Sequence, residues 1–202
     1  MITKFCEKVT NLFSGKFNLQ DKEISNLNYG LEIVVRFLIE IILLFYISYY
    51  LNILKPVLVS FITFIILRLK AGGAHLPTYP MCLSFSLLVF ISIGKFVNFY
   101  TPDRNILIIW LLILAYISLK FINQYAPGDT DKIPIKDKKV RKQLKNQSKF
   151  IFIIWLIMSF ILLNFSNIYS LIFASSFGII AEIMSLHPKV YNISDNYLKS
   201  YK

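Results

Sequence analysis

Long apolar runs alternate with shorter polar connections along most of the chain. A bilayer hydrocarbon core about 30 Å thick is crossed by about 20 helical residues, and several of these runs approach that length. The pattern therefore predicts an all-α, polytopic integral membrane protein with about six transmembrane helices. The second and fifth runs are short for a full span, which a tilted or partly re-entrant helix would accommodate. The predicted spans lie near residues 31–51, 56–69, 81–99, 106–122, 150–163 and 168–186.

Residues 1–26 follow a different pattern, in which apolar side chains recur at helical spacing between charged ones. One apolar face and one polar face predict an amphipathic helix lying on the inner leaflet of the membrane. On that helix Cys6 is a small apolar residue of the buried face. The segment lacks the short apolar core of a cleavable signal peptide. The apolar positions are Ile2, Phe5, Cys6, Val9, Leu12 and Phe13.

Composition agrees with the membrane interpretation. Of the 202 residues, 56% are hydrophobic and 16% are aromatic, which is more apolar than soluble domains. The formal net charge of +11 could indicate a nucleic-acid partner. In a membrane protein, however, Lys and Arg are more simply explained by orientation and by contact with anionic lipid. We therefore expect anionic lipid, and no nucleic acid, among the partners.

The distribution of the cations predicts the orientation. Six spans place both termini on one side, together with the turn at 68–82 and the basic connection at 123–149. That side holds most of the 22 Lys and Arg residues, whereas Lys55, Lys95 and Arg104 lie on the other. Positive residues gather in cytoplasmic loops. We therefore expect a multi-pass protein of the cell membrane, with one transmembrane domain over residues 1–202 and with both termini and the 68–82 turn in the cytoplasm.

The turn at residues 68–82, RLKAGGAHLPTYPMC, contains candidate chemistry. Proline is favoured at the first position of a helix, so the third span is predicted to start at Pro80 and to carry Cys82 in its first turn. Unpaired backbone N–H groups and the positive end of the helix dipole favour a thiolate there. The same N–H groups could donate to the oxyanion of a tetrahedral intermediate.

A histidine precedes this cysteine by seven residues. A continuous helix would hold the two side chains about 10 Å apart, but the two intervening prolines prevent that helix and allow a fold-back. Gly72 and Gly73 permit a tight exit from the second span, because glycine tolerates a positive φ. His75 beside Cys82 at the membrane–cytoplasm interface is a constellation for acyl transfer.

Blander interpretations stay open at this point. A His and a Cys in one membrane loop are usually coincidental, and Arg68 and Lys70 at a helix end are usually interfacial anchors. A zinc site needs three or four ligands, and only His187 and Cys6 remain as further soft ligands. We therefore expect neither a metal nor another cofactor. Charged residues within the spans, Glu182 in the last one among them, are functional suspects because hydrocarbon disfavours them.

Two sequence elements resemble one known family. RLKAGGAH, followed by six residues and a Cys between two spans, is similar to the first motif of accessory gene regulator B proteins, the membrane cysteine endopeptidases of Gram-positive quorum-sensing systems. YAPGDTDKIPI at residues 125–135 is similar to an element of that family's large cytoplasmic loop. The resemblance covers nearly the whole chain. It implies that His75 and Cys82 are the catalytic pair and that Arg68 and Gly73 support them.

The resemblance also implies the substrate class. The expected partner is a small precursor peptide with an amphipathic leader and an acidic C-terminal tail. Removal of the tail would leave the rest of the peptide on the enzyme as a thioester, and an internal Cys would then close a thiolactone ring.

Two further sets of residues have less specific support. Asp129 is a candidate third member that orients His75, but Asp-Thr after Pro-Gly is also an ordinary turn. A cluster of cations in the 123–149 connection could attract the acidic tail, or could only orient the protein and touch anionic lipid. The cations of this cluster are Lys138, Lys139, Arg141 and Lys142.

A peptide transporter or permease without peptidase chemistry is the alternative function. A transporter has no need of a thiol at this helix start, whereas a cysteine peptidase loses all its chemistry without one. The sequence leaves open the identity and cleavage site of the peptide, the ring size, export of the product and a homodimeric state.

Overall fold

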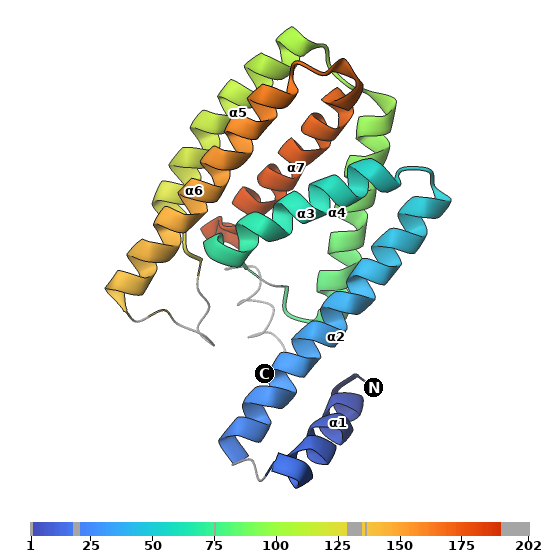
Figure 1. Ribbon diagram of the computed structural model, residues 1–202, viewed down its shortest axis with the longest axis vertical. Coiled ribbons are helices and arrows are strands. Elements are labelled where there is room, and N and C mark those ends of the chain that lie inside the picture. The colour runs from blue at the N-terminus through green and yellow to red at the C-terminus, as the bar shows by residue number, and fades with distance from the viewer. Residues whose placement is uncertain (1, 18–20, 75, 129–134, 136, 191–202) are drawn as a thin grey trace. The chain divides into compact units, whose positions relative to one another are not determined.

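The computed structural model describes residues 2–17, 21–74, 76–128, 135 and 137–190. The described residues are almost entirely helical, and they form no β-strand beyond an isolated bridge between Gly72 and Gly128. The all-α prediction is thereby confirmed. Figure 1 shows the elements, which are α1 (Ile2–Phe17), α2 (Asp21–Tyr50), α3 (Leu54–Ala71), α4 (Tyr79–Phe99), α5 (Arg104–Tyr125), α6 (Lys138–Leu162), the short 3-10 helix η1 (Ser166–Ile168) and α7 (Tyr169–Ser185).

Each of the six predicted apolar runs forms a helix, but the number of spans differs from the prediction. Four helical segments in the described part of the chain are long and apolar enough to cross a membrane, where the sequence analysis predicts six. These segments are Tyr79–Phe99, Arg104–Tyr125, Lys138–Leu162 and Ser166–Ser185.

Charged residues occur in the helices of the first two predicted spans, and α3 carries three of them. The run at 31–51 contains an ion pair between Glu32 and Arg36, and α3 holds Lys55, Arg68 and Lys70 within 18 residues. A charge at the centre of a bilayer costs about 2.5–3.5 kcal/mol on insertion scales. Counting apolar residues alone therefore overestimates how many of these helices qualify as spans.

The basic connection also differs from the prediction, because its second half is not a loop. Helix α6 begins at Lys138, well before the predicted fifth span, and Asp137 is its N-cap. The Asp137 carboxylate accepts a hydrogen bond from the Lys139 N–H at 2.7 Å. An Asp cap followed by Lys, Arg, Gln and Leu favours a helix, so the polar half of α6 needs no apolar run to form.

The chain divides into two compact units, residues 1–47 and 48–202. In the first unit, α1 confirms the predicted N-terminal helix. Cys6 is fully buried, as predicted, together with Thr10, whereas Phe5 and Leu12 are 57% and 73% exposed. The apolar stripe is therefore only partly covered by protein, as expected of a helix whose apolar face meets lipid.

In the second unit, α7 is the most buried helix and packs against α3, α4 and α5 (Figure 1). Small residues allow this packing, as is common between membrane helices. A Cβ at Gly178 would overlap the backbone of Ser60 on α3. Trp110 and Trp155 donate their indole N–H groups to Ser176 and Ser175 of α7, at 2.8 and 3.2 Å.

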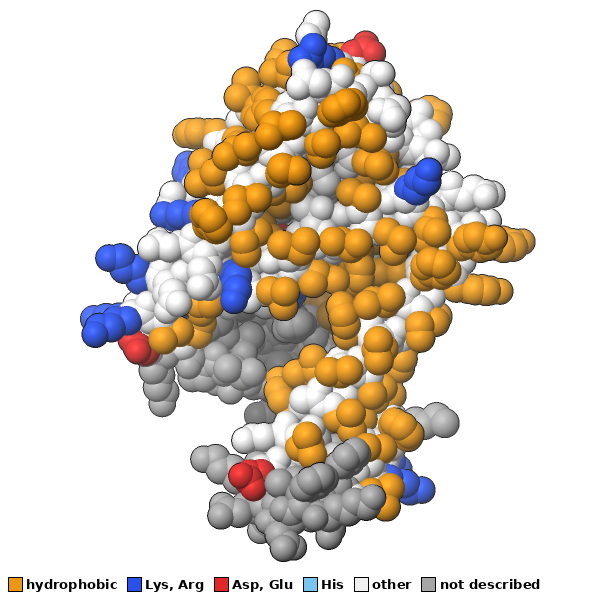
Figure 2. Space-filling model, in the orientation of Figure 1, with side chains coloured by type: hydrophobic (Ala, Val, Ile, Leu, Met, Phe, Trp, Pro, Cys, Tyr) orange, Lys and Arg blue, Asp and Glu red, His pale blue; other side chains and the backbone are white. Residues whose placement is uncertain are grey.

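Exposed apolar side chains are numerous on the helices, and they cover most of the face shown in Figure 2. In a soluble protein such a surface would be an association site. On helices of this length it is the surface expected to meet lipid.

An apolar cluster underlies the end of the second unit at which α3, α5 and α7 finish and α4 and α6 begin. Its members come from α3, α5, α6 and α7 and from the residues that directly follow α5 and α7, so it joins these four helices. The cluster consists of Leu67, Ala71, Leu114, Ile122, Ala126, Phe152, Ile179, Ile183 and Leu186.

Candidate active site

The exit from α3 confirms the conformation predicted for the glycine pair. Gly72 caps α3 with φ 71°, its N–H donates to the Arg68 carbonyl at 2.9 Å, and Gly73 follows with φ 144°. Only glycine adopts such angles without strain. The chain therefore turns sharply off the helix immediately before the segment that contains His75.

The two sequence motifs meet at this exit. The Gly128 N–H donates to the Ala71 carbonyl at 2.7 Å, and Gly72 and Gly128 form a parallel β-bridge. A Cβ at Gly72 would overlap the Gly128 carbonyl, so the contact is backbone against backbone. The described part of the YAPGDT element is thus joined to the RLKAGGAH element through main-chain atoms of Gly128.

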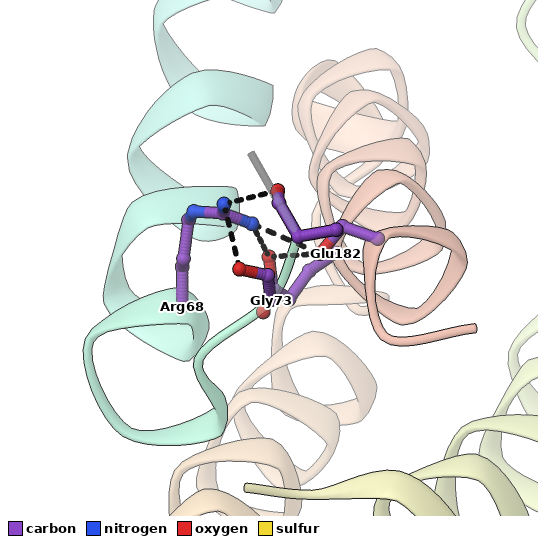
Figure 3. A network of polar contacts seen from close by, with 5 residues as sticks. Arg68, Gly73 and Glu182 are labelled. Atoms are coloured by element: carbon purple, nitrogen blue, oxygen red, sulfur yellow. Dashed lines mark hydrogen bonds and ion pairs between the residues drawn. The ribbon is translucent and has the colours of Figure 1, made fainter. Parts of the chain in front are cut away.

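Arg68 connects three segments of the second unit, as Figure 3 shows. Its Nη1 donates to Glu182 Oε2 at 3.2 Å and to Ser185 Oγ at 2.9 Å, both on α7. Its Nη2 donates to the Ala74 carbonyl at 2.8 Å and to the Gly73 carbonyl at 3.4 Å. The guanidinium group therefore ties the end of α3 to α7 and to the two residues that precede His75.

Gly73 has no room for a side chain in this arrangement. A Cβ there would overlap Ser185 Oγ and the Arg68 guanidinium group. Arg68 and Gly73, which the sequence analysis names as supporting residues, are thus in direct contact. Glu182 was a functional suspect because of its charge within an apolar helix, but sequence reasoning missed Ser185, since a serine in such a helix gives no signal.

Cys82 lies in the first turn of α4. The helix begins at Tyr79 with Thr78 as its N-cap and a proline in its first two positions, one residue earlier than predicted. Cys82 is partly exposed. Its own N–H donates to the Thr78 carbonyl at 3.0 Å. Because this N–H is already bonded within the helix, it is not available to an oxyanion. Fewer of the N–H donors that the sequence analysis expected for the oxyanion therefore remain.

His75 and Asp129 lie outside the described residues. Their immediate neighbours are described. Ala74 is buried and its N–H donates to the Ser185 carbonyl at 3.1 Å, and Gly128 is bonded to Ala71 as above. Residues 76–78 are not helical, in agreement with the prediction that two prolines interrupt any helix between His75 and Cys82.

The cations expected to attract a peptide tail lie in the first turns of α6. All four side chains are exposed. They are Lys138, Lys139, Arg141 and Lys142.

Comparison with known proteins identifies the family. Residues 6–186 match the family described as accessory gene regulator B. The chain belongs to the accessory gene regulator B family. It is 29% identical to an accessory gene regulator protein B of Staphylococcus aureus over 171 residues, which cover 85% of this chain and 86% of that relative.

Other relatives of this AgrB-family protein share most of its length. An AgrB-like protein of Clostridium acetobutylicum is 28% identical over 199 residues, covering 96% of this chain and 91% of that protein. One of Clostridium perfringens is 29% identical over 195 residues, with 92% and 91% coverage. No solved structure matches the chain. Membership associates the protein with accessory gene regulator quorum sensing in a membrane family, which the four apolar helices fit.

Proposed function

We propose that this protein is a membrane cysteine endopeptidase that removes the C-terminal tail of a precursor signalling peptide. The observation that carries the proposal is the position of Cys82, a partly exposed thiol in the first turn of α4. It follows a segment that two motifs of the AgrB family anchor through Arg68 and Gly128. A packing role alone would not require a thiol at this helix start.

In the proposed reaction His75 is the general base and Cys82 is the nucleophile. His75 takes the thiol proton, and the sulfur attacks the carbonyl carbon of the peptide bond before the acidic tail. The tetrahedral intermediate collapses, its C–N bond breaks, and His75 returns the proton to the departing amine. The precursor remains bound to Cys82 as a thioester.

The second half of the reaction makes the signal. The thiol of an internal Cys of the precursor gives up its proton and attacks the thioester carbonyl. The bond from that carbon to the Cys82 sulfur breaks, which closes the thiolactone ring, and Cys82 leaves as a thiolate that takes up the proton. No water enters this step, so the energy of the acyl bond is conserved in the ring. The ring closure requires an internal Cys in the substrate, and the family resemblance adds an amphipathic leader and an acidic tail.

The proposed site faces the cytoplasm, as do both chain termini. The cations of α6 and of the connecting segments support this orientation through the preference of Lys and Arg for cytoplasmic loops. The exposed cations at the start of α6 attract the acidic tail. Asp129, which would orient His75, is the proposed third member of the site.

Replacement of Cys82 tests the proposal against a transporter. Cys82→Ala and Cys82→Ser are expected to abolish cleavage of the precursor while membrane insertion stays intact, because either change removes the nucleophile. Co-expression with a precursor peptide that has an internal Cys and an acidic tail, followed by mass measurement of the products, reads out cleavage. Cys6→Ala is the matched control, since it removes the other thiol and should leave cleavage unchanged. Full processing by the Cys82→Ala protein would overturn the peptidase assignment.

A further inference from the structure

A buried carboxylate stands behind the RLKAGGAH motif. Glu182 lies on α7 and is fully buried, and its Oε2 accepts hydrogen bonds from Arg68 Nη1 and Ser185 Oγ, each at 3.2 Å (Figure 3). Its other oxygen, Oε1, is buried and has no hydrogen-bond partner among the described residues. Arg68 is also largely shielded, with 18% of its side chain exposed.

This ion pair is a poor device for stability alone. Desolvation of two charges can exceed their attraction, and an apolar pair of similar volume is often at least as stable. An unsatisfied buried oxygen adds a further penalty. The surroundings offer apolar packing, because Ile179 and Ile183 of the same helix belong to the adjacent apolar cluster. The pair therefore suggests a positional role.

The contacts of Arg68 show what is positioned. One guanidinium nitrogen binds α7, and the other binds the carbonyls of Gly73 and Ala74. The Ala74 N–H in turn donates to the Ser185 carbonyl. The backbone that leads into His75 is thus held from both sides by the end of α7, and Glu182 supplies the charge that keeps Arg68 in place.

We propose that Glu182 is a positioning residue of the active site, acting through Arg68 on the Gly73–Ala74 backbone. This inference rests on the proposed function, because it assumes that His75 works on Cys82. Glu182 touches neither substrate nor reacting atoms in this assignment. Without its charge, Arg68 Nη1 would lose the carboxylate that holds it against α7, and the flexible side chain would turn toward solvent, releasing the two carbonyls.

The test is Glu182→Gln, which keeps the shape of the side chain and removes its charge. We expect kcat for cleavage of a precursor with an internal Cys and an acidic tail to fall about 100-fold, the size of effect that a misplaced catalytic group produces. KM should change less than about twofold, because the precursor-binding surface is untouched. Glu182→Asp keeps the charge and should recover part of the lost kcat. Wild-type kcat in Glu182→Gln would overturn the inference.

A double-mutant cycle distinguishes a positioning role of Glu182 from a general structural role. If Glu182 acts only through Arg68, adding Glu182→Gln to Arg68→Ala should cause no further loss of kcat. Multiplying losses would show independent roles and overturn the inference. Ser176→Ala is the matched control, because it removes a buried α7 hydroxyl that contacts Trp110 instead. It should lower thermal stability while leaving kcat per folded molecule unchanged.

Failure of the inference and failure of the proposed function give different results. Cleavage that depends on Cys82 but ignores Glu182→Gln overturns only the positioning role. Cleavage that survives Cys82→Ala overturns the peptidase itself, and the positioning role with it.

Discussion

The two ends of the second unit are built by different means. At the end where α4 meets α5 and α6 meets α7, aromatic side chains fill the space, with ring centroids 4.9–6.3 Å apart. Arg104 closes that end with one exposed hydrogen bond to Asn164. The end that carries Cys82 has, beside its apolar cluster, a buried ion pair, two glycines with positive φ and a backbone bridge.

The difference indicates which end is built for function. Aromatic packing is the sum of many contacts that are each worth only about 0.1–0.2 kcal/mol, so no single one fixes the position of a particular backbone segment. Buried charges and backbone contacts have only a few acceptable arrangements, and a half-satisfied network is costly. The polar end therefore holds one geometry at the expense of stability, as expected where reacting groups must be aligned.

The largest expected effect comes from the histidine at the polar end. His75→Ala should slow precursor cleavage about 10²–10⁴-fold, because it removes the base and the proton donor together. His75→Gln should rescue little, since an amide cannot take the proton. Mass measurement of the products gives the rate. Labelling of Cys82 by iodoacetamide should slow in parallel, with buried Cys6 as an internal reference.

His187 provides the matched control for that prediction. It packs against Phe121 and Tyr125, with ring centroids 6.0 and 5.7 Å away, and accepts a hydrogen bond from the Lys189 N–H. His187→Ala should leave cleavage near the wild-type rate. Equal losses from the two substitutions, or normal turnover by His75→Gln, would reclassify His75 as a structural loop residue.

The next largest effect on kcat is expected when a glycine of the polar end is replaced by alanine. The same replacement at the opposite end serves as its comparison. Gly72→Ala forces a side chain into a positive φ and against the Gly128 carbonyl, so it should separate the two motifs and lower kcat about 100-fold. Gly94→Ala meets only the side chains of Val57 and Ile53 on the opposite end. Its overpacking should cost about 1–3 kcal/mol of stability and leave kcat per folded molecule unchanged.

Thermal unfolding in detergent and single-turnover cleavage, measured on the same preparations, separate the two outcomes. A loss of kcat in Gly94→Ala as deep as that in Gly72→Ala would remove the distinction between the ends.

The sequence predicted those features that single residue types dictate. Apolar runs become helices, glycines at 72 and 73 adopt positive φ, and a proline opens α4. Each of these follows from the covalent structure of the residue or from local periodicity. Four helical segments of the described residues qualify as spans where six were predicted, and the three charges of α3 account for part of that difference.

The features that the sequence could not supply depend on tertiary contacts. The hydrogen bond from Gly128 to Ala71 joins residues far apart in the chain, and nothing in either motif specifies the register in which they meet. The sequence also gives no indication that Ser185 belongs to this network, because its role arises from its place beside Arg68. The polar start of α6 could have been predicted as a helix, because Asp137 precedes a run of helix formers. Its high charge favoured a loop prediction instead.

The smallest expected effect concerns binding of the precursor rather than the chemical step. It involves the first turns of α6. Exposed cations there oppose the helix dipole, each by about 0.3–1 kcal/mol, whereas α5 at the other end begins with the single cation Arg104. The proposed compensation is attraction of the precursor's acidic tail.

Reversing the four cations to Glu should therefore raise KM for an acidic-tailed precursor several-fold and change kcat little, because the start of α6 acts before the thioester forms. The substitutions are Lys138→Glu, Lys139→Glu, Arg141→Glu and Lys142→Glu. Acidic residues suit a helix N-terminus, so loss of the helix would not explain a rise in KM.

A neutral-tailed precursor should hardly respond, and added salt should reduce the difference, since exposed charges are screened over about 8 Å at physiological ionic strength. Topology must be verified in the same membranes, because removing four cytoplasmic cations can invert a span. If insertion is normal and both precursors respond equally, the start of α6 does not recognise the tail, and its cations serve only orientation and contact with anionic lipid.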